Sequence, residues 1–210
     1  MGKLAIWFRQ PAHDWLEALP VGNGLLGAMI FGGVPLERIQ VNEKTVWSGC
    51  RYNLERPDAR EYVEQARKSL FEGRYCEAEE LVRNHVTVWP PGRHSYEMLC
   101  NVYLEFSDAR DLVYSVREYG RCLGLEEAVA WVEYAAGQWR HKREVFASFA
   151  DKVLVARVES SRRDLNFSVS VERRDAEAAV EGDMIVLRGH ALCPCHGAGV
   201  ELAAALKRAR

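Results

Sequence analysis

The sequence predicts a mainly β protein: an antiparallel β-sandwich that carries one inserted α-helical hairpin. Three observations predict it. Many short runs are rich in strand-forming residues and bounded by Gly or Pro, strands do not alternate with helices as in a doubly wound sheet, and only residues 57–86 have a helical period. With 210 residues and 48% hydrophobic residues, we expect one domain, residues 1–210, with a packed core.

The expected strands share a high content of β-branched and aromatic residues. Residues 153–158 are almost continuously apolar, so we expect this strand in the centre of a sheet. Residues 165–172 alternate apolar with polar side chains, which predicts one buried face and one solvent-facing face. Gly137 predicts a tight turn between two further strands. The expected strands are residues 4–9, 26–31, 39–41, 102–106, 129–134, 140–146, 153–158, 165–172, 184–187 and 200–206.

The helical insert is expected over about residues 57–86. Pro57 and Asp58 are typical of a helix start, and Gly73 ends the first helix before a second one follows. The apolar positions expected to face inward are Ala59, Val63, Ala66 and Leu70 in the first helix and Tyr75, Ala78, Leu81 and Val82 in the second.

Composition excludes several classes of partner. There are 28 Lys and Arg residues against 30 Asp and Glu, a formal charge of -2, whereas nucleic-acid and membrane-surface binders need a basic excess. No apolar run is long enough to span a membrane, and the first residues lack the apolar core of a secretory signal. We therefore expect a cytoplasmic protein with reduced thiols. The six cysteines are Cys50, Cys76, Cys100, Cys122, Cys193 and Cys195.

Two motifs suggest ligands but lack the context that those ligands need. Residues 22–27 match the dinucleotide fingerprint G-x-G-x-x-G, and Glu43 lies near the expected ribose-binding position. However, residues 17–20 before the motif do not resemble a buried strand, and Gly32, Gly33 and Pro35 leave no room for the helix that must bind the pyrophosphate. The motif is instead typical of a tight loop with a positive φ angle.

The second motif is a cluster of metal-ligand residue types near the C-terminal end. All four lie within seven residues, and a tetrahedral zinc site usually takes its ligands from two separated pairs. We therefore expect surface thiols and no metal. The cluster consists of His190, Cys193, Cys195 and His196.

A third segment, residues 42–49, combines the side chains found on sugar-binding surfaces. Asn42 and Glu43 offer polar groups for sugar hydroxyls, and the indole of Trp47 can stack on a sugar ring. The alternative is a structural turn with Trp47 in the core, because most tryptophans are largely buried. The same two alternatives apply to Trp7, Trp15 and Trp131.

The sequence does not reveal catalytic machinery. Glycoside hydrolysis needs two carboxyl groups that face each other across a cleft, and no spacing distinguishes a pair among Asp14, Glu17, Glu37 and Glu43. No Ser-His-Asp set, nucleophile elbow or phosphate loop is present. We expect no catalytic residue and no cofactor.

Several stretches resemble the start of glycoside hydrolase family 95, the α-L-fucosidases and their relatives. The resemblance is densest at the N-terminus and spans most of the chain. The matching stretches are residues 4–12, 15–24, 26–33, 37–43, 47–49, 67–73, 75, 78–79, 103–106 and 143–148.

The resemblance implies a β-sandwich of the supersandwich type, followed in the family by an (α/α)6 barrel that carries the acid and the water-activating groups. The chain ends at Arg210, so the resemblance implies a truncated, non-catalytic domain whose partner is the absent barrel and whose ligands are fucose-containing glycans. We expect the surface that faces the substrate or the barrel to contain Gly22, Asn23, Gly24, Asn42, Glu43 and Trp47.

Two alternatives remain open. A stand-alone carbohydrate-binding module requires at least one tryptophan exposed to solvent. A structural remnant that binds its own catalytic half requires a large apolar patch where the barrel docks. Missing strands or a missing barrel would leave sheet edges without hydrogen-bond partners.

Overall fold

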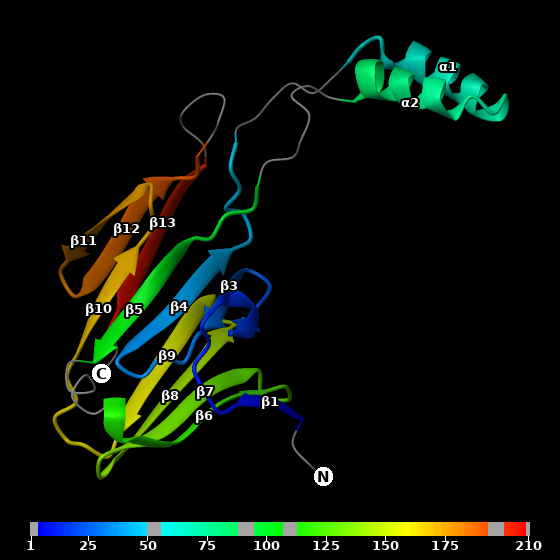
Figure 1. Cartoon of the computed structure of the whole chain (residues 1–210). Helices are drawn as coiled ribbons and strands as arrows, with labels where there is room; N and C mark the ends of the chain where they lie inside the picture. Colours follow the sequence, from blue (N-terminus) through cyan, green and yellow to red (C-terminus); the bar gives the residue numbers. More distant parts are fainter. Residues whose placement is uncertain (1–3, 50–55, 88–94, 107–112, 193–199, 209–210) are drawn as a thin grey trace.

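The protein is a layered β structure with one helical hairpin, which confirms the predicted fold class (Figure 1). The computed structural model describes residues 4–49, 56–87, 95–106, 113–192 and 200–208. Its strands pair antiparallel in three sheets. None of the helices in these ranges is long and apolar enough to cross a membrane.

Each sheet is listed here in spatial order. The first consists of β1 (Ala5–Phe8), β6 (Val116–Gly124), β7 (Val129–Ala136), β8 (Trp139–Ser148) and β9 (Val153–Ser160). The second consists of β10 (Phe167–Glu172), β5 (Cys100–Phe106), β4 (Leu36–Glu43), β3 (Leu26–Ile30) and β2 (Leu19–Gly22). The third consists of β11 (Ala176–Glu181), β12 (Met184–His190) and β13 (Glu201–Lys207). Short 3-10 helices are η1 (Trp15–Glu17) and η4 (Val113–Ser115).

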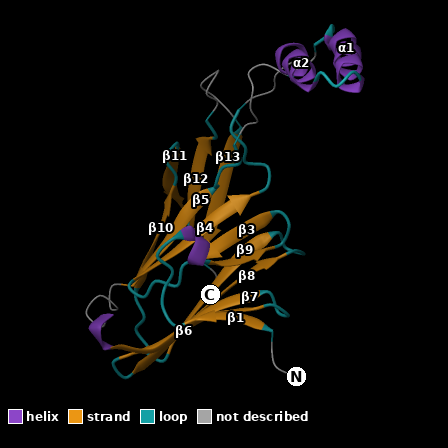
Figure 2. Cartoon of the chain, turned by 45° about the vertical axis from the view of Figure 1, so that its right-hand side comes forward, coloured by secondary structure: helices purple, strands orange, loops and turns teal. Residues whose placement is uncertain are grey.

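The first two sheets stack face to face and form the sandwich. Strand β2 packs against β6, β7 and β8, and β3 packs against β8 and β9. The third sheet lies beside β10, and its Leu187 and Leu202 join the same apolar core (Figure 2). The predicted alternation of β10 is confirmed, because Phe167, Val169 and Val171 face this core while the serines between them are exposed.

The helical hairpin consists of α1 (Ala59–Phe71), α2 (Tyr75–Leu81) and the π-helical turn η2 (Val82–Val86), as the sequence predicts. Gly73 provides the turn with a φ of 80°. The helices pack on each other through Ala66, Ser69 and Ala78 and stand apart from the sheets in Figure 1.

The expected inward face of the hairpin is partly wrong. Leu70, Tyr75 and Val82 are exposed, whereas Ala66 and Ala78 are buried. These short helices pack on each other and on η2 and bury a narrow, small-residue face, so the larger apolar side chains at its margin remain in solvent.

The expected position of residues 153–158 in the centre of a sheet is wrong, because β9 is an edge strand. Leu154 and Val158 pack against the core, while Val153 is exposed. A continuous apolar run indicates that both faces of a strand are buried. Whether the strand is an edge strand depends instead on its hydrogen bonds within the sheet plane, which the apolar pattern does not indicate. The strand that is buried along almost its whole length is β5.

Three strands, β2, β6 and β11, were not predicted, for identifiable reasons. Strand β11 consists mostly of Ala and Glu, which are poor strand formers, and most of its residues are exposed. Strand β2 contains Pro20, which has no N–H for a central ladder, but β2 is the edge of its sheet and tolerates it. Strand β6 is irregular, because its pairing with β7 shifts between Arg117 and Gly120 and Glu118 has a φ of 53°.

A buried ion pair joins the two stacked sheets. Glu37 on β4 and Arg143 on β8 are 1% and 4% exposed, and Arg143 Nη1 lies 3.1 Å from Glu37 Oε2. The Gly32 N–H donates to Glu37 Oε1 over 2.7 Å, and Arg143 Nη2 donates to the Gly33 carbonyl over 2.6 Å. Both charges therefore bind each other and the same loop between β3 and β4.

Two further side chains extend this network. The Tyr119 hydroxyl donates to the Gly32 carbonyl over 2.7 Å. Arg121, which is also buried, donates to the carbonyls of Gln10 and Glu17 over 2.7 and 2.6 Å. Strand β6 of the first sheet is thereby tied both to the Gly32 loop and to the segment that leads into β2.

We predict that Arg143→Met destabilises the protein by about 3–5 kcal/mol, because it leaves the Glu37 carboxylate buried without its counter-charge. The free energy of unfolding from urea denaturation measures the loss. Arg157→Met is the matched control, since Arg157 forms its ion pairs at the surface and should cost about 1 kcal/mol or less. Equal losses in the two variants would contradict the assigned role of the buried pair.

Candidate functional site

The structure brings the sequence-selected residues together at one end of the second sheet. Strands β2, β3 and β4 are consecutive and antiparallel, so the β2–β3 turn lies beside the end of β4. Gly27 pairs with Asn42, and the Lys44 N–H donates to the Leu25 carbonyl over 3.0 Å. Gly22, Asn23 and Gly24 therefore share this end with Asn42, Glu43 and Trp47.

Asn23 organises the β2–β3 turn. Its Oδ1 accepts hydrogen bonds from the N–H groups of Leu25 and Leu26 over 3.0 and 2.8 Å. Its Nδ2 donates to the Ser148 carbonyl at the end of β8 over 2.6 Å, so it also connects the two stacked sheets. The amide of Asn23 therefore positions the turn, and Gly24 at its tip has the positive φ expected, 85°.

The dinucleotide interpretation fails in the structure as expected. The glycine motif forms an antiparallel hairpin, in which Gly22 pairs with Gly27. No helix begins after it, so the backbone N–H groups that would bind a pyrophosphate are absent from this part of the chain. Glu43 is engaged instead in its own turn, where its Oε2 accepts from the N–H of Thr45 over 2.8 Å and from the Thr45 hydroxyl.

Trp47 lies outside the core, so the structural alternative with a buried Trp47 is wrong. Its side chain is 45% exposed, and its Nε1–H donates to the Lys44 carbonyl over 3.0 Å. Tyr96, which is 44% exposed, lies against it with ring centroids 5.1 Å apart and planes inclined by 53°. The Tyr96 hydroxyl donates to the Glu43 carbonyl over 3.1 Å. Tyr96 was not predicted, because no motif marks it in the sequence.

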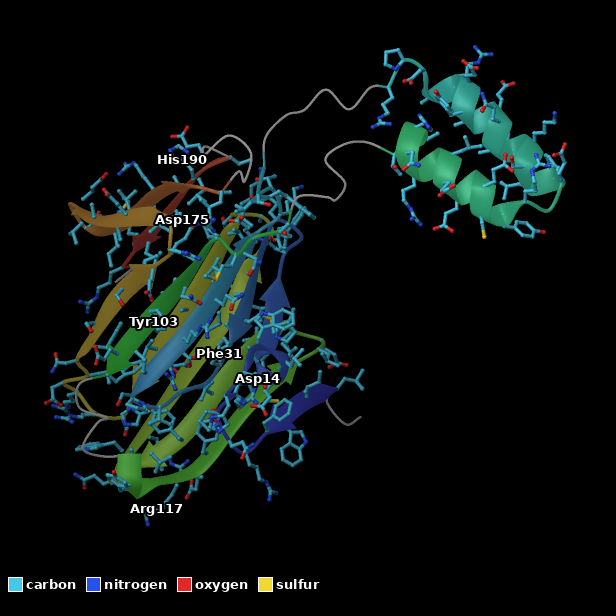
Figure 3. All side chains as sticks on the ribbon, turned by 45° about the horizontal axis from the view of Figure 1, so that its top comes forward. Asp14, Phe31, Tyr103, Arg117, Asp175 and His190 are labelled. Carbon is cyan, nitrogen blue, oxygen red and sulfur yellow. The ribbon has the colours of Figure 1, made fainter. Side chains whose placement is uncertain are left out.

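Exposed apolar side chains also gather on β1, on η1 and at the end of β6. Trp7 and Trp15 are 62% and 52% exposed, and every residue of β1 is exposed. Figure 3 shows β1 and the labelled Asp14, which precedes η1, on the same side of the sandwich. We call this the β1–η1 surface; it comprises Leu4, Ile6, Trp7, Phe8, Trp15, Leu16 and Leu125.

The four carboxylates considered for catalysis do not form a pair across a cleft. Asp14 caps η1 by accepting from the Leu16 N–H, and Glu17 accepts from the His13 N–H, each over 2.8 Å. Burial raises the pKa of Glu37, although Arg143 opposes the shift. This is the property of a general acid, but Glu37 is sealed between the sheets and inaccessible to a glycan.

A cavity of about 280 Å³ lies on the first sheet, between β6, β7, β8 and β9. Its three carboxylates are ion-paired: Glu118 with Arg140 over 2.8 Å, Glu133 with Lys142 over 3.5 Å, and Glu159 with Arg157. His141 at its wall stacks on Tyr134, and burial, followed by the charge of Arg143, lowers the pKa of His141. The wall of this cavity is therefore a network of ion pairs at the surface of the sheet.

The other expected sites are only partly covered by the structure. Cys193, Cys195 and His196 lie outside the described residues, as does Cys50; His190 ends β12. Within the described ranges, no three His, Cys, Asp or Glu side chains are grouped to hold a metal. The described thiols Cys76, Cys100 and Cys122 form no disulfide.

Comparison with known proteins identifies relatives of this chain. The family model described as "Glycosyl hydrolase family 65, N-terminal domain" matches residues 6–209. "Alpha-L-fucosidase 2" of Arabidopsis thaliana is 34% identical over 89% of this chain and 22% of its own length. "Probable alpha-fucosidase A" of Aspergillus niger is 27% identical over 69% of this chain and 18% of its own length. The chain thus spans about a fifth of these relatives.

We predict that Asn23→Ala destabilises the protein by about 1–3 kcal/mol, because it leaves the Leu25 and Leu26 N–H groups and the Ser148 carbonyl without this partner. Asn23→Asp is the matched variant, since it keeps both acceptor bonds but turns a carboxylate oxygen, in place of the Nδ2 donor, toward the Ser148 carbonyl. Urea denaturation should rank the wild type above both variants. An Ala variant as stable as the wild type would rule out a positioning role for Asn23.

Proposed function

This chain belongs to the glycosyl hydrolase family 65 N-terminal domain family, and from this premise we propose that it is the N-terminal domain of an α-L-fucosidase-like glycoside hydrolase. The observation that carries the proposal is the 34% identity to an α-L-fucosidase over 89% of the chain. The matching family model bears the number 65. The finer assignment to family 95 is supported by the motifs in the first 49 residues and by the names of the relatives.

We propose that the domain supports hydrolysis without performing it. The acid with a raised pKa, Glu37, is sealed between two sheets, and the carboxylates of the cavity on the first sheet are ion-paired with Arg140, Lys142 and Arg157. Chemistry at a glycosidic bond would then come from a catalytic (α/α)6 barrel that acts with this domain on fucose-containing glycans.

We further propose that the β1–η1 surface is the contact for that barrel. Its side chains are aliphatic and aromatic on both faces of a short edge strand, which is a composition typical of protein interfaces. The end with Asn23, Glu43 and Trp47 would then be left for the substrate.

A stand-alone carbohydrate-binding module is the second candidate. It requires a tryptophan exposed to solvent, and Trp47 meets that requirement with its ring half-exposed on a polar turn. The two candidates differ in one respect: only the first needs a catalytic partner and an apolar surface to bind it.

The purified chain should not hydrolyse an aryl α-L-fucoside, because Glu37 is buried and the carboxylates that line the cavity on the first sheet are ion-paired. Release of the chromophore is measured against a heat-treated sample. Replacing the matched segment of the Arabidopsis "Alpha-L-fucosidase 2" with this chain should give an active chimera. Turnover by the isolated chain would refute the non-catalytic role, and an inactive but soluble chimera would count against the α-L-fucosidase assignment.

In that chimera, Leu16→Ser should lower the yield of soluble activity several-fold, because it puts a hydroxyl into the proposed interface. In the isolated chain the same substitution should change stability by about 0.5 kcal/mol or less, since Leu16 is exposed there. Phe71→Ser at the exposed tip of the helical hairpin is the control and should leave activity unchanged. Equal effects of Leu16→Ser and Phe71→Ser would contradict docking at the β1–η1 surface.

A further inference from the structure

We propose that Trp47 and Tyr96 form a preorganised stacking platform for the pyranose ring of a glycan. The position of the site follows from the geometry of the two rings. The kind of sugar expected there rests on the proposed function. Both rings are about half exposed, at 45% and 44%, and they lie against each other at the end of the second sheet.

The polar atoms of both rings are already bound within the protein. Trp47 donates to the Lys44 carbonyl and Tyr96 donates to the Glu43 carbonyl, so one turn holds both side chains in place. A ligand would therefore contact the faces of the two rings and not their polar atoms. Fixing the side chains before binding also reduces the entropy lost when a ligand is bound.

The backbone beneath the rings is fixed to the core. Trp47 and Tyr96 form an isolated antiparallel bridge, and the Glu97 N–H donates to the Val46 carbonyl over 3.0 Å. Ser48 and Ser95 exchange two hydrogen bonds of 2.8 Å next to the bridge. The neighbouring Val46 is buried in the core, so the chain directs Val46 inward and Trp47 outward.

The geometry of the rings suits a sugar ring. The two rings contact each other, with centroids 5.1 Å apart and planes inclined by 53°, so a sugar ring would stack on an outward face of this pair and not between the rings. The faces of aromatic rings are negative and attract the slightly positive C–H groups on one face of a pyranose, and the methyl group of a 6-deoxyhexose enlarges that apolar face. The Glu43 and Thr45 side chains at the same turn provide polar groups for hydroxyls.

Trp7, which is also exposed, lies in a different environment. Trp7 has the Arg9 guanidinium over its ring, 5.3 Å from the centroid, and its strand neighbours Ile6 and Phe8 are apolar and exposed. That environment suits a protein surface, whereas a bound sugar needs hydrogen-bond partners around the aromatic ring.

The test is titration of the intact chain with L-fucose, 2′-fucosyllactose and maltose, followed by NMR of the indole N–H signals. We expect millimolar binding of the fucosyl sugars, with the Trp47 signal shifted; Trp47→Phe assigns that signal. Trp47→Ala and Tyr96→Ala should weaken binding about tenfold. Trp15→Ala is the control and should bind like the wild type, and unchanged thermal unfolding should show that each variant is folded.

The outcomes separate the platform from the proposed function. Equal binding by the wild type, Trp47→Ala and Tyr96→Ala would overturn the platform, as would no binding of any of the three sugars, and neither result affects the activity of the chimera. Binding that depends on Trp47 but favours maltose over the fucosyl sugars would support the platform and contradict the α-L-fucosidase assignment.

Discussion

The ion pair between Glu37 and Arg143 determines how the two stacked sheets meet. Each charge is removed from water, so any arrangement that separates them leaves a buried charge without a partner, at a cost of several kcal/mol. The pair also binds both glycines of the loop between β3 and β4, at Gly32 N–H and the Gly33 carbonyl. The position of β4 is therefore fixed relative to β8, and with it the position of the turn that follows β4.

This constraint extends to the candidate site through short chain segments. Strand β4 begins beside the ion pair and ends at Glu43, whose carbonyl accepts from Tyr96. Strand β8 carries Arg143 and ends at Ser148, whose carbonyl accepts from Asn23. The buried ion pair therefore joins β4 to β8, and the part-buried bond of Asn23 joins the β2–β3 turn to the end of β8. Trp47 follows the end of β4, and Tyr96 precedes β5.

Much of the fold could be predicted from side-chain patterns, because burial of one face leaves a period in the sequence. The alternation of β10 and the helical period of α1 are examples. The order of the strands within a sheet leaves no pattern in the sequence, because it depends on backbone hydrogen bonds that every residue except proline can make. For this reason β9 was expected in the centre of a sheet, although it is an edge, and β2 was missed because Pro20 excludes only a central position.

The part of the candidate site that is built from consecutive strands could be predicted from the sequence. Asn23 and Glu43 come together because consecutive antiparallel strands bring their ends side by side. Tyr96 lies 53 residues after Glu43, and only the tertiary fold pairs it with Trp47. Average burial of tryptophan favoured the core for Trp47, yet Val46 already occupies the inward position, and adjacent residues of an extended segment point to opposite sides. The same alternation that buries Val46 therefore places the indole in solvent, where a ligand can reach it.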